Sequence, residues 1–104
     1  MATMSEEIMR LEMLRRTRTG KKTAITKRIA RVIGMIEAGG CSRRQIKFLM
    51  EKLVNVYDEL EGVCTEISQL SVIMGLNEEP LNNLEDVRMN VGECAAHVEE
   101  HLDS

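Results

Sequence analysis

An unbroken alternation of three- and four-residue spacings joins apolar side chains through the middle of this 104-residue chain. A period of 3.5 residues is typical of a helix that packs along a seam against another helix. Ser42 and Gln45 form a capping-box pattern before the seam, and Gly75 suits a helix C-cap after it. We therefore predict a helix over 42–75, about 50 Å long, which requires a long partner. Its seam, the predicted core and interface, continues to Met74 and comprises Ile46, Leu49, Leu53, Val56, Leu60, Val63, Ile67 and Leu70.

The segment before this helix supplies a partner of similar length. The same spacing joins Ile8, Leu11, Arg15, Arg18, Lys22, Ile25, Ile29, Val32 and Ile36. We predict a helix over 6–38, antiparallel to the next one because the link at 39–41 is short. The middle of its seam is cationic, and an unpaired buried charge costs several kcal/mol. We therefore expect those cations either to extend outward along their apolar stems or to leave the partner helix, and we predict a weak point near Gly20.

A third apolar stripe runs through the C-terminal segment. Its members are Leu81, Leu84, Val87, Val91, Cys94, Val98 and Leu102, and they predict a helix over 80–102 that begins with Pro80 in its first turn. One proline and 2% aromatic residues disfavour a β-sandwich or barrel and a base-stacking platform. The expected fold class is all-α, a single domain over 1–104 in which a long antiparallel helical hairpin and a third helix form a coiled-coil-like bundle.

Charge is divided unevenly along the chain. Residues 1–50 hold twelve Lys and Arg against four Asp and Glu, whereas residues 51–104 hold two against thirteen. One interpretation is that the basic half folds against the acidic half. The other is that the basic segment binds a polyanion such as nucleic acid, independently of sequence and with strong salt dependence. The candidate nucleic-acid-binding residues are Arg15, Arg16, Arg18, Lys21, Lys22, Lys27, Arg28 and Arg31.

Few residues suggest catalytic or metal chemistry. Cys94, His97 and His101 have a C-x2-H-x3-H spacing that brings them close to one helix face, which makes them a weak zinc candidate. The alternative is a buried cysteine beside two solvent-facing histidines, and we expect no metal and no other cofactor. The chain has no Gly-rich phosphate loop and no nucleophile elbow, so we expect neither an enzyme nor a small-molecule substrate. With three widely spaced cysteines, no secretory signal and no apolar run long enough to span a bilayer, we expect reduced thiols in an intracellular protein, cytoplasmic or nuclear, without membrane contact.

A family resemblance is carried by the segment from Met9 to Ile36, in which a Leu-rich start leads into the basic run Arg15-Arg16-Thr17-Arg18-Thr19-Gly20-Lys21-Lys22. An acidic helical stretch, Leu53 to Leu60, follows it. This order resembles the N-terminal helical region of Gag-like polyproteins of metazoan BEL/Pao-type retroelements, or a host-domesticated derivative. The resemblance implies a non-catalytic assembly or interaction segment, and it supplies no catalytic residues.

These observations favour an interaction protein. The seam of the middle helix is longer than the third helix and more apolar than the middle of the first, so we expect apolar surface to remain uncovered in a monomer. We therefore predict a self-association or protein-interaction module whose partner is a second copy, most simply in a dimer, or another helical protein. Nucleic-acid binding through the basic segment is the alternative.

Overall fold

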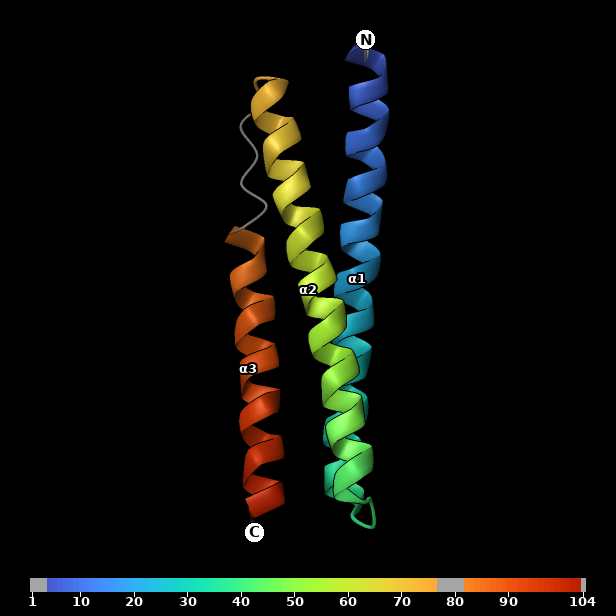
Figure 1. Cartoon of the computed structure of the whole chain (residues 1–104), viewed down its shortest axis with the longest axis vertical. Helices are drawn as coiled ribbons and strands as arrows, with labels where there is room; N and C mark the ends of the chain where they lie inside the picture. The colour runs from blue at the N-terminus through green and yellow to red at the C-terminus, as the bar shows by residue number, and fades with distance from the viewer. Residues whose placement is uncertain (1–3, 77–81, 104) are drawn as a thin grey trace.

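The chain folds as three helices packed side by side, seen in a computed structural model that describes residues 4–76 and 82–103 (Figure 1). Helix α1 spans Met4–Ala38, α2 spans Arg43–Ile73 and α3 spans Asn82–Asp103. The described residues contain no strand, and the predicted all-α class is confirmed. The molecule measures 56 × 18 × 16 Å. The predicted start of the third helix, at Pro80 and Leu81, lies outside the described residues.

Helices α1 and α2 form a long antiparallel hairpin, and α3 lies beside the part of it nearer the α1–α2 turn (Figure 1). The turn depends on Gly39 and Gly40, whose φ angles of +74° and +79° favour glycine. The α2 capping box is present, because the Ser42 side chain accepts the Gln45 N–H and the Gln45 side chain accepts the Ser42 N–H. These local signals fix where α1 ends and α2 begins.

Helix α1 continues without a break through Gly20, so the predicted weak point does not interrupt it. The neighbouring threonines, expected to weaken the helix, direct their hydroxyl groups into it instead. Thr17 donates to the Met13 carbonyl at 3.0 Å, and Thr23 donates to the Thr19 carbonyl at 3.0 Å. Because each hydroxyl donates to the carbonyl four residues earlier in the same helix, it does not stabilise a turn that would compete with the helix. Packing along α2 then outweighs the weak local preference for helix.

The core lies along the seam of α2. Ile46, Leu53, Leu60 and Ile67 have no exposed surface, and Leu49, Val56, Val63 and Leu70 are half-buried. Cys64 and Ser71 are also fully buried on α2. The other helices contribute buried apolar side chains, which are Leu11, Ile25, Val32, Leu84, Cys94 and Val98. The seam of α2 is therefore used mainly inside the chain, and the apolar surface expected to remain uncovered is found elsewhere. Over the described residues, the hydropathy of every helix falls below what a bilayer span requires.

Candidate interaction surfaces

The cations in the middle of the α1 seam are half-buried. Arg15, Arg18 and Lys22 keep part of their side chains in solvent, which agrees with the expectation that their stems pack while their charges stay hydrated. Arg18 and Lys22 lie close enough to the buried Cys64 thiol to lower its pKa. Burial raises that pKa by more, so the net shift is upward. The seam therefore accommodates cations without enclosing them.

The opposite charges of the two chain halves meet at a few ion pairs. Arg10 of α1 lies 3.3 Å from Glu66 of α2, and Lys21 of α1 pairs with Glu59 of α2. Arg88 of α3 lies 3.5 Å from Glu61, and its Nε donates to the Tyr57 hydroxyl at 3.1 Å. These contacts use only a fraction of the α1 cations. Within residues 4–76 and 82–103, no ion pair involves Lys27, Arg28 or Arg31.

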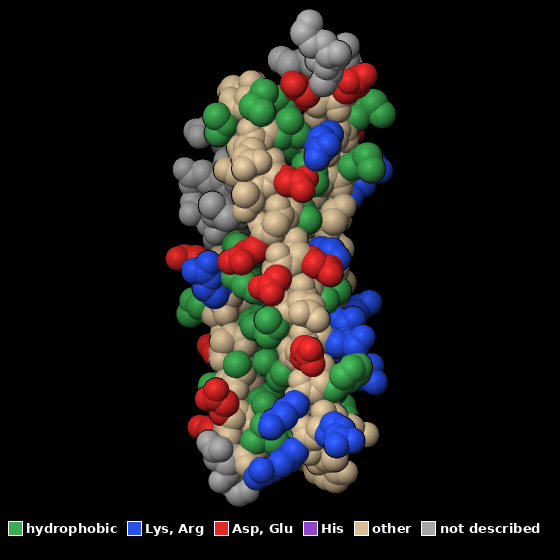
Figure 2. All heavy atoms as spheres, viewed as in Figure 1, with side chains coloured by type: hydrophobic (Ala, Val, Ile, Leu, Met, Phe, Trp, Pro, Cys, Tyr) green, Lys and Arg blue, Asp and Glu red, His purple; other side chains and the backbone are tan. Residues whose placement is uncertain are grey.

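Those three cations border a groove that we call the basic groove. It has a volume of about 270 Å³ and is lined by Ala24, Lys27, Arg28, Arg31 and Leu49. Lys and Arg side chains gather over the lower part of the hairpin, below a band of acidic side chains (Figure 2). No Asp or Glu occurs in α1 between Glu12 and Glu37, so this face of α1 is free of internal acids. Of the eight candidate nucleic-acid-binding residues, Lys27, Arg28 and Arg31 form this groove, while Lys21 pairs with Glu59 and Arg15 also has an interaction partner.

The metal candidate is not assembled. Cys94 is buried and donates its thiol proton to the Met50 sulfur at 3.8 Å, whereas His97 is exposed and His101 is half-buried. Among the described residues, no group of three or more His, Cys, Asp or Glu side chains is arranged to hold a metal ion. The helix spacing alone thus overstates how closely these side chains converge.

Exposed apolar side chains gather at the end of the hairpin that α3 does not reach (Figures 1 and 2). We call this region the free end. It comprises Ile8, Met9 and Met13 of α1, Val72 and Ile73 at the end of α2, and Leu76 just after α2. The exposed fractions are 64% and 66% for the two methionines and 75% and 70% for Val72 and Ile73. Only two helices pack against each other here, which leaves outer apolar side chains without cover from a third.

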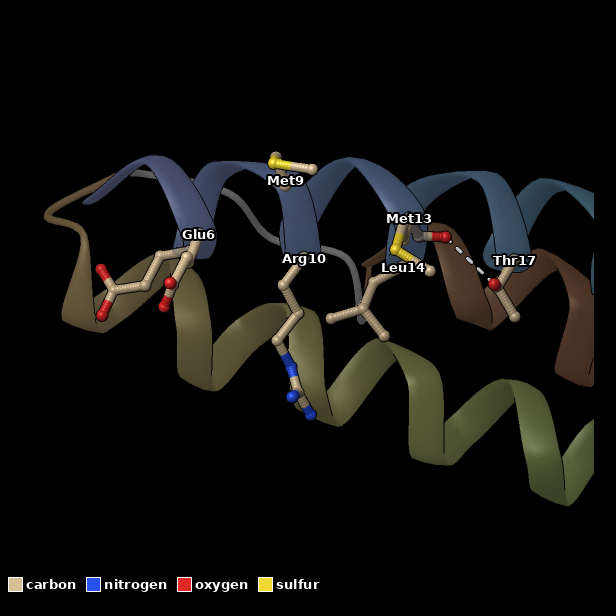
Figure 3. Close-up of a pocket in the computed structure, with 7 residues that line it drawn as sticks. Glu6, Met9, Arg10, Met13, Leu14 and Thr17 are labelled. Carbon is tan, nitrogen blue, oxygen red and sulfur yellow. Dashed lines mark hydrogen bonds between the residues drawn. The ribbon is translucent and has the colours of Figure 1, made fainter. Parts of the chain in front are cut away.

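One side of the free end is a shallow groove of about 540 Å³ along the first turns of α1. Its lining includes Glu6, Met9, Arg10 and Met13. Arg10 and Leu14 point from α1 toward α2, whereas Met9 lies on the other side of α1 (Figure 3). Met9 and Met13 are 64% and 66% exposed, so both lie on the surface of α1 and outside the buried core.

This outer face was not predicted from the sequence. The stripe traced on the first helix was the one that faces α2. A second spacing of 3, 4 and 3 residues joins Glu6, Met9, Met13 and Arg16, all exposed. This second seam is visible in the sequence, but the sequence does not say which of two seams meets the core.

No protein-family model, curated protein or solved structure matches this chain. The resemblance to Gag-like segments therefore stays a prediction.

Proposed function

We propose that this chain is a non-catalytic helical self-association module that pairs through the free end of its hairpin. The observation that carries the proposal is the clustering of large exposed apolar side chains where α1 and α2 extend beyond α3. Exposed apolar side chains concentrated at one end of a small protein favour an interaction there, because covering them removes apolar surface from water. The seam of α2 supports the arrangement by holding α1 and α2 together as a stiff platform.

A non-catalytic role agrees with the state of the two buried thiols. Burial raises the pKa of both Cys64 and Cys94, which keeps them protonated at neutral pH. A thiol is a weak nucleophile in that form.

Sedimentation of the whole chain over a concentration series tests the proposal. We expect the mean mass to rise with concentration and the M9E/M13E variant to stay monomeric, because two carboxylates on the patch oppose its burial. M89E is the matched control, since Met89 of α3 is 63% exposed but lies outside the free end. A wild-type chain that stays monomeric at the highest soluble concentration would refute self-association.

A second function, nucleic-acid binding, is favoured by the basic groove. Lys27, Arg28 and Arg31 lie together without internal ion-pair partners in the described part of the chain, and they border open space. Such side chains contact phosphates whatever the base sequence, and binding weakens as salt rises because counterions are no longer released favourably.

Binding of a mixed-sequence duplex and a single strand, measured by fluorescence anisotropy at several salt concentrations, tests this function. K27E/R28E/R31E should abolish binding, whereas R44E/K47E, which reverses two exposed charges at the start of α2 outside the groove, should reduce it less. Absence of binding by the wild type at low salt would refute it.

A further inference from the structure

Four exposed side chains on the outer face of α1 form a palindromic stripe. Glu6, Met9, Met13 and Arg16 are spaced 3, 4 and 3 residues apart. The spacings are therefore the same in both directions along the helix, and the midpoint of the stripe is at position 11. The two central members are apolar and the two outer members have opposite charge. These spacings are those of a helix seam, and each member is exposed on the side of α1 away from the core.

We propose that two copies of this chain pair along this stripe as an antiparallel, two-fold symmetric dimer; this inference rests on the proposed self-association and names its geometry. With the symmetry axis level with position 11, Met9 of each copy packs against Met13 of the other. Glu6 of each copy then lies opposite Arg16 of the other. One stripe is thus its own complement, as an isologous interface requires.

The charge pattern selects the antiparallel direction. If the two stripes ran parallel in register, Glu6 would lie opposite Glu6 and Arg16 opposite Arg16, and both contacts would be repulsive. The antiparallel register replaces two like-charge contacts by two opposite-charge contacts while it keeps the methionines in the centre. Charged side chains at the rim of an apolar seam set orientation and partner choice in this way in paired helices.

The shape of α1 is compatible with such pairing. The helix is continuous from Met4 to Ala38, so no break interrupts the stripe. Arg10 and Leu14 point toward α2 and leave the outer face unobstructed (Figure 3).

Charge-reversal variants distinguish this register from any other pairing of the two copies. E6R places a cation opposite Arg16 in both symmetric contacts, and R16E places a carboxylate opposite Glu6 in both. Each variant alone should self-associate about tenfold or more weakly than the wild type, because two attractions become two repulsions.

A mixture of the two variants in equal amounts should restore association. The substituted side chains of E6R and R16E have opposite charge and face each other in the mixed dimer. The second contact of that dimer joins the unchanged Arg16 of the E6R copy to the unchanged Glu6 of the R16E copy. Both contacts are therefore attractive again, as in the wild type.

Matched controls are E37R and R31E, which reverse exposed charges on α1 outside the stripe and should associate as the wild type does. The helical circular dichroism of every variant is compared with that of the wild type, and the rescue in the mixture itself excludes misfolding of the two single variants. Recovery of dimer in the mixture supports the register. A wild-type dimer that both reversals leave unchanged, or that the mixture fails to restore, overturns the register alone. A monomeric wild type overturns both this inference and the proposed function.

Discussion

The Cys94 sulfur of α3 lies 3.8 Å from the Met50 sulfur of α2, with the thiol fully buried and the methionine half-buried. The thiol donates to the thioether, which is a weak acceptor. Sulfur side chains thus help to join α3 to the hairpin in a chain that holds only one Phe and one Tyr. Burial removes this sulfur from water and therefore disfavours the charged thiolate.

Stability should therefore fall at alkaline pH. Burial raises the pKa of both Cys94 and Cys64, and in the unfolded chain these thiols titrate near their ordinary value of about 8.5. Above that pH the unfolded chain loses these protons before the folded chain does, so the free energy of unfolding decreases until the folded thiols also ionise. Urea titrations between neutral and alkaline pH measure the slope. The C64A/C94A variant should be less stable throughout yet show a shallower decrease, and an equal slope in both proteins would contradict the assignment.

Two glycines near the end of α1 should respond in opposite directions to the same substitution. Gly34 lies inside the helix with open space at its Cβ site, so G34A should raise the free energy of unfolding by about 0.5–1 kcal/mol. Gly39 also has open space but a φ of +74°, so G39A should lower it by about 1 kcal/mol. Thermal melts of the two variants check the signs, and a gain of about 1 kcal/mol corresponds to a rise of roughly 4–8 °C.

Leu60 is a core residue of the single chain. It has no exposed surface and belongs to the cluster that joins all three helices. L60A should lower the free energy of unfolding by about 2–5 kcal/mol, since it removes buried methyl groups and leaves a cavity. V54A, at a position 41% exposed on the same helix, should cost far less. Denaturant melts compare the two, and a similar small loss in both would place Leu60 outside the core.

The same residue shows what the sequence could and could not predict. The 3–4 spacing identified Leu60 and its helix correctly, because burial of one face imposes that period. It could not say whether a second copy or the same chain would cover the seam, since either provides an apolar helix. Nor did it predict that Cys64 and Ser71 would be fully buried while Val63 and Leu70 are only half-buried. That choice depends on the helices packed around α2, which is a property of the assembled bundle. The outer stripe of α1 was likewise not predicted, because the inner seam contains more apolar side chains and dominates the sequence pattern.

The Ser42 cap should contribute measurably to stability. Its side-chain oxygen accepts the Gln45 N–H at 3.2 Å and thereby satisfies one of the unpaired donors at the start of α2. S42A should lower the free energy of unfolding by about 1 kcal/mol, whereas S42D should keep most of it because aspartate also caps well. Equilibrium denaturation of the two variants measures the difference, and equal losses would mean that the hydroxyl contact is not made in solution.

The ion pair of Lys21 with Glu59 should be weakly stabilising and sensitive to salt. Both side chains are partly exposed, at 31% and 56%, so solvent screens their attraction. A double-mutant cycle with K21A, E59A and the double variant should give a coupling of about 0.2–1 kcal/mol at low salt, which decreases as ionic strength rises.

Lys27, on the same helix but without an internal partner in the described structure, is the control. K27A should change the free energy of unfolding by less than about 0.5 kcal/mol, because its charge is available to an external anion and does not hold the fold together. A loss for K27A as large as that for K21A would show that the basic groove has a structural role, and would remove the reason to consider it a binding surface.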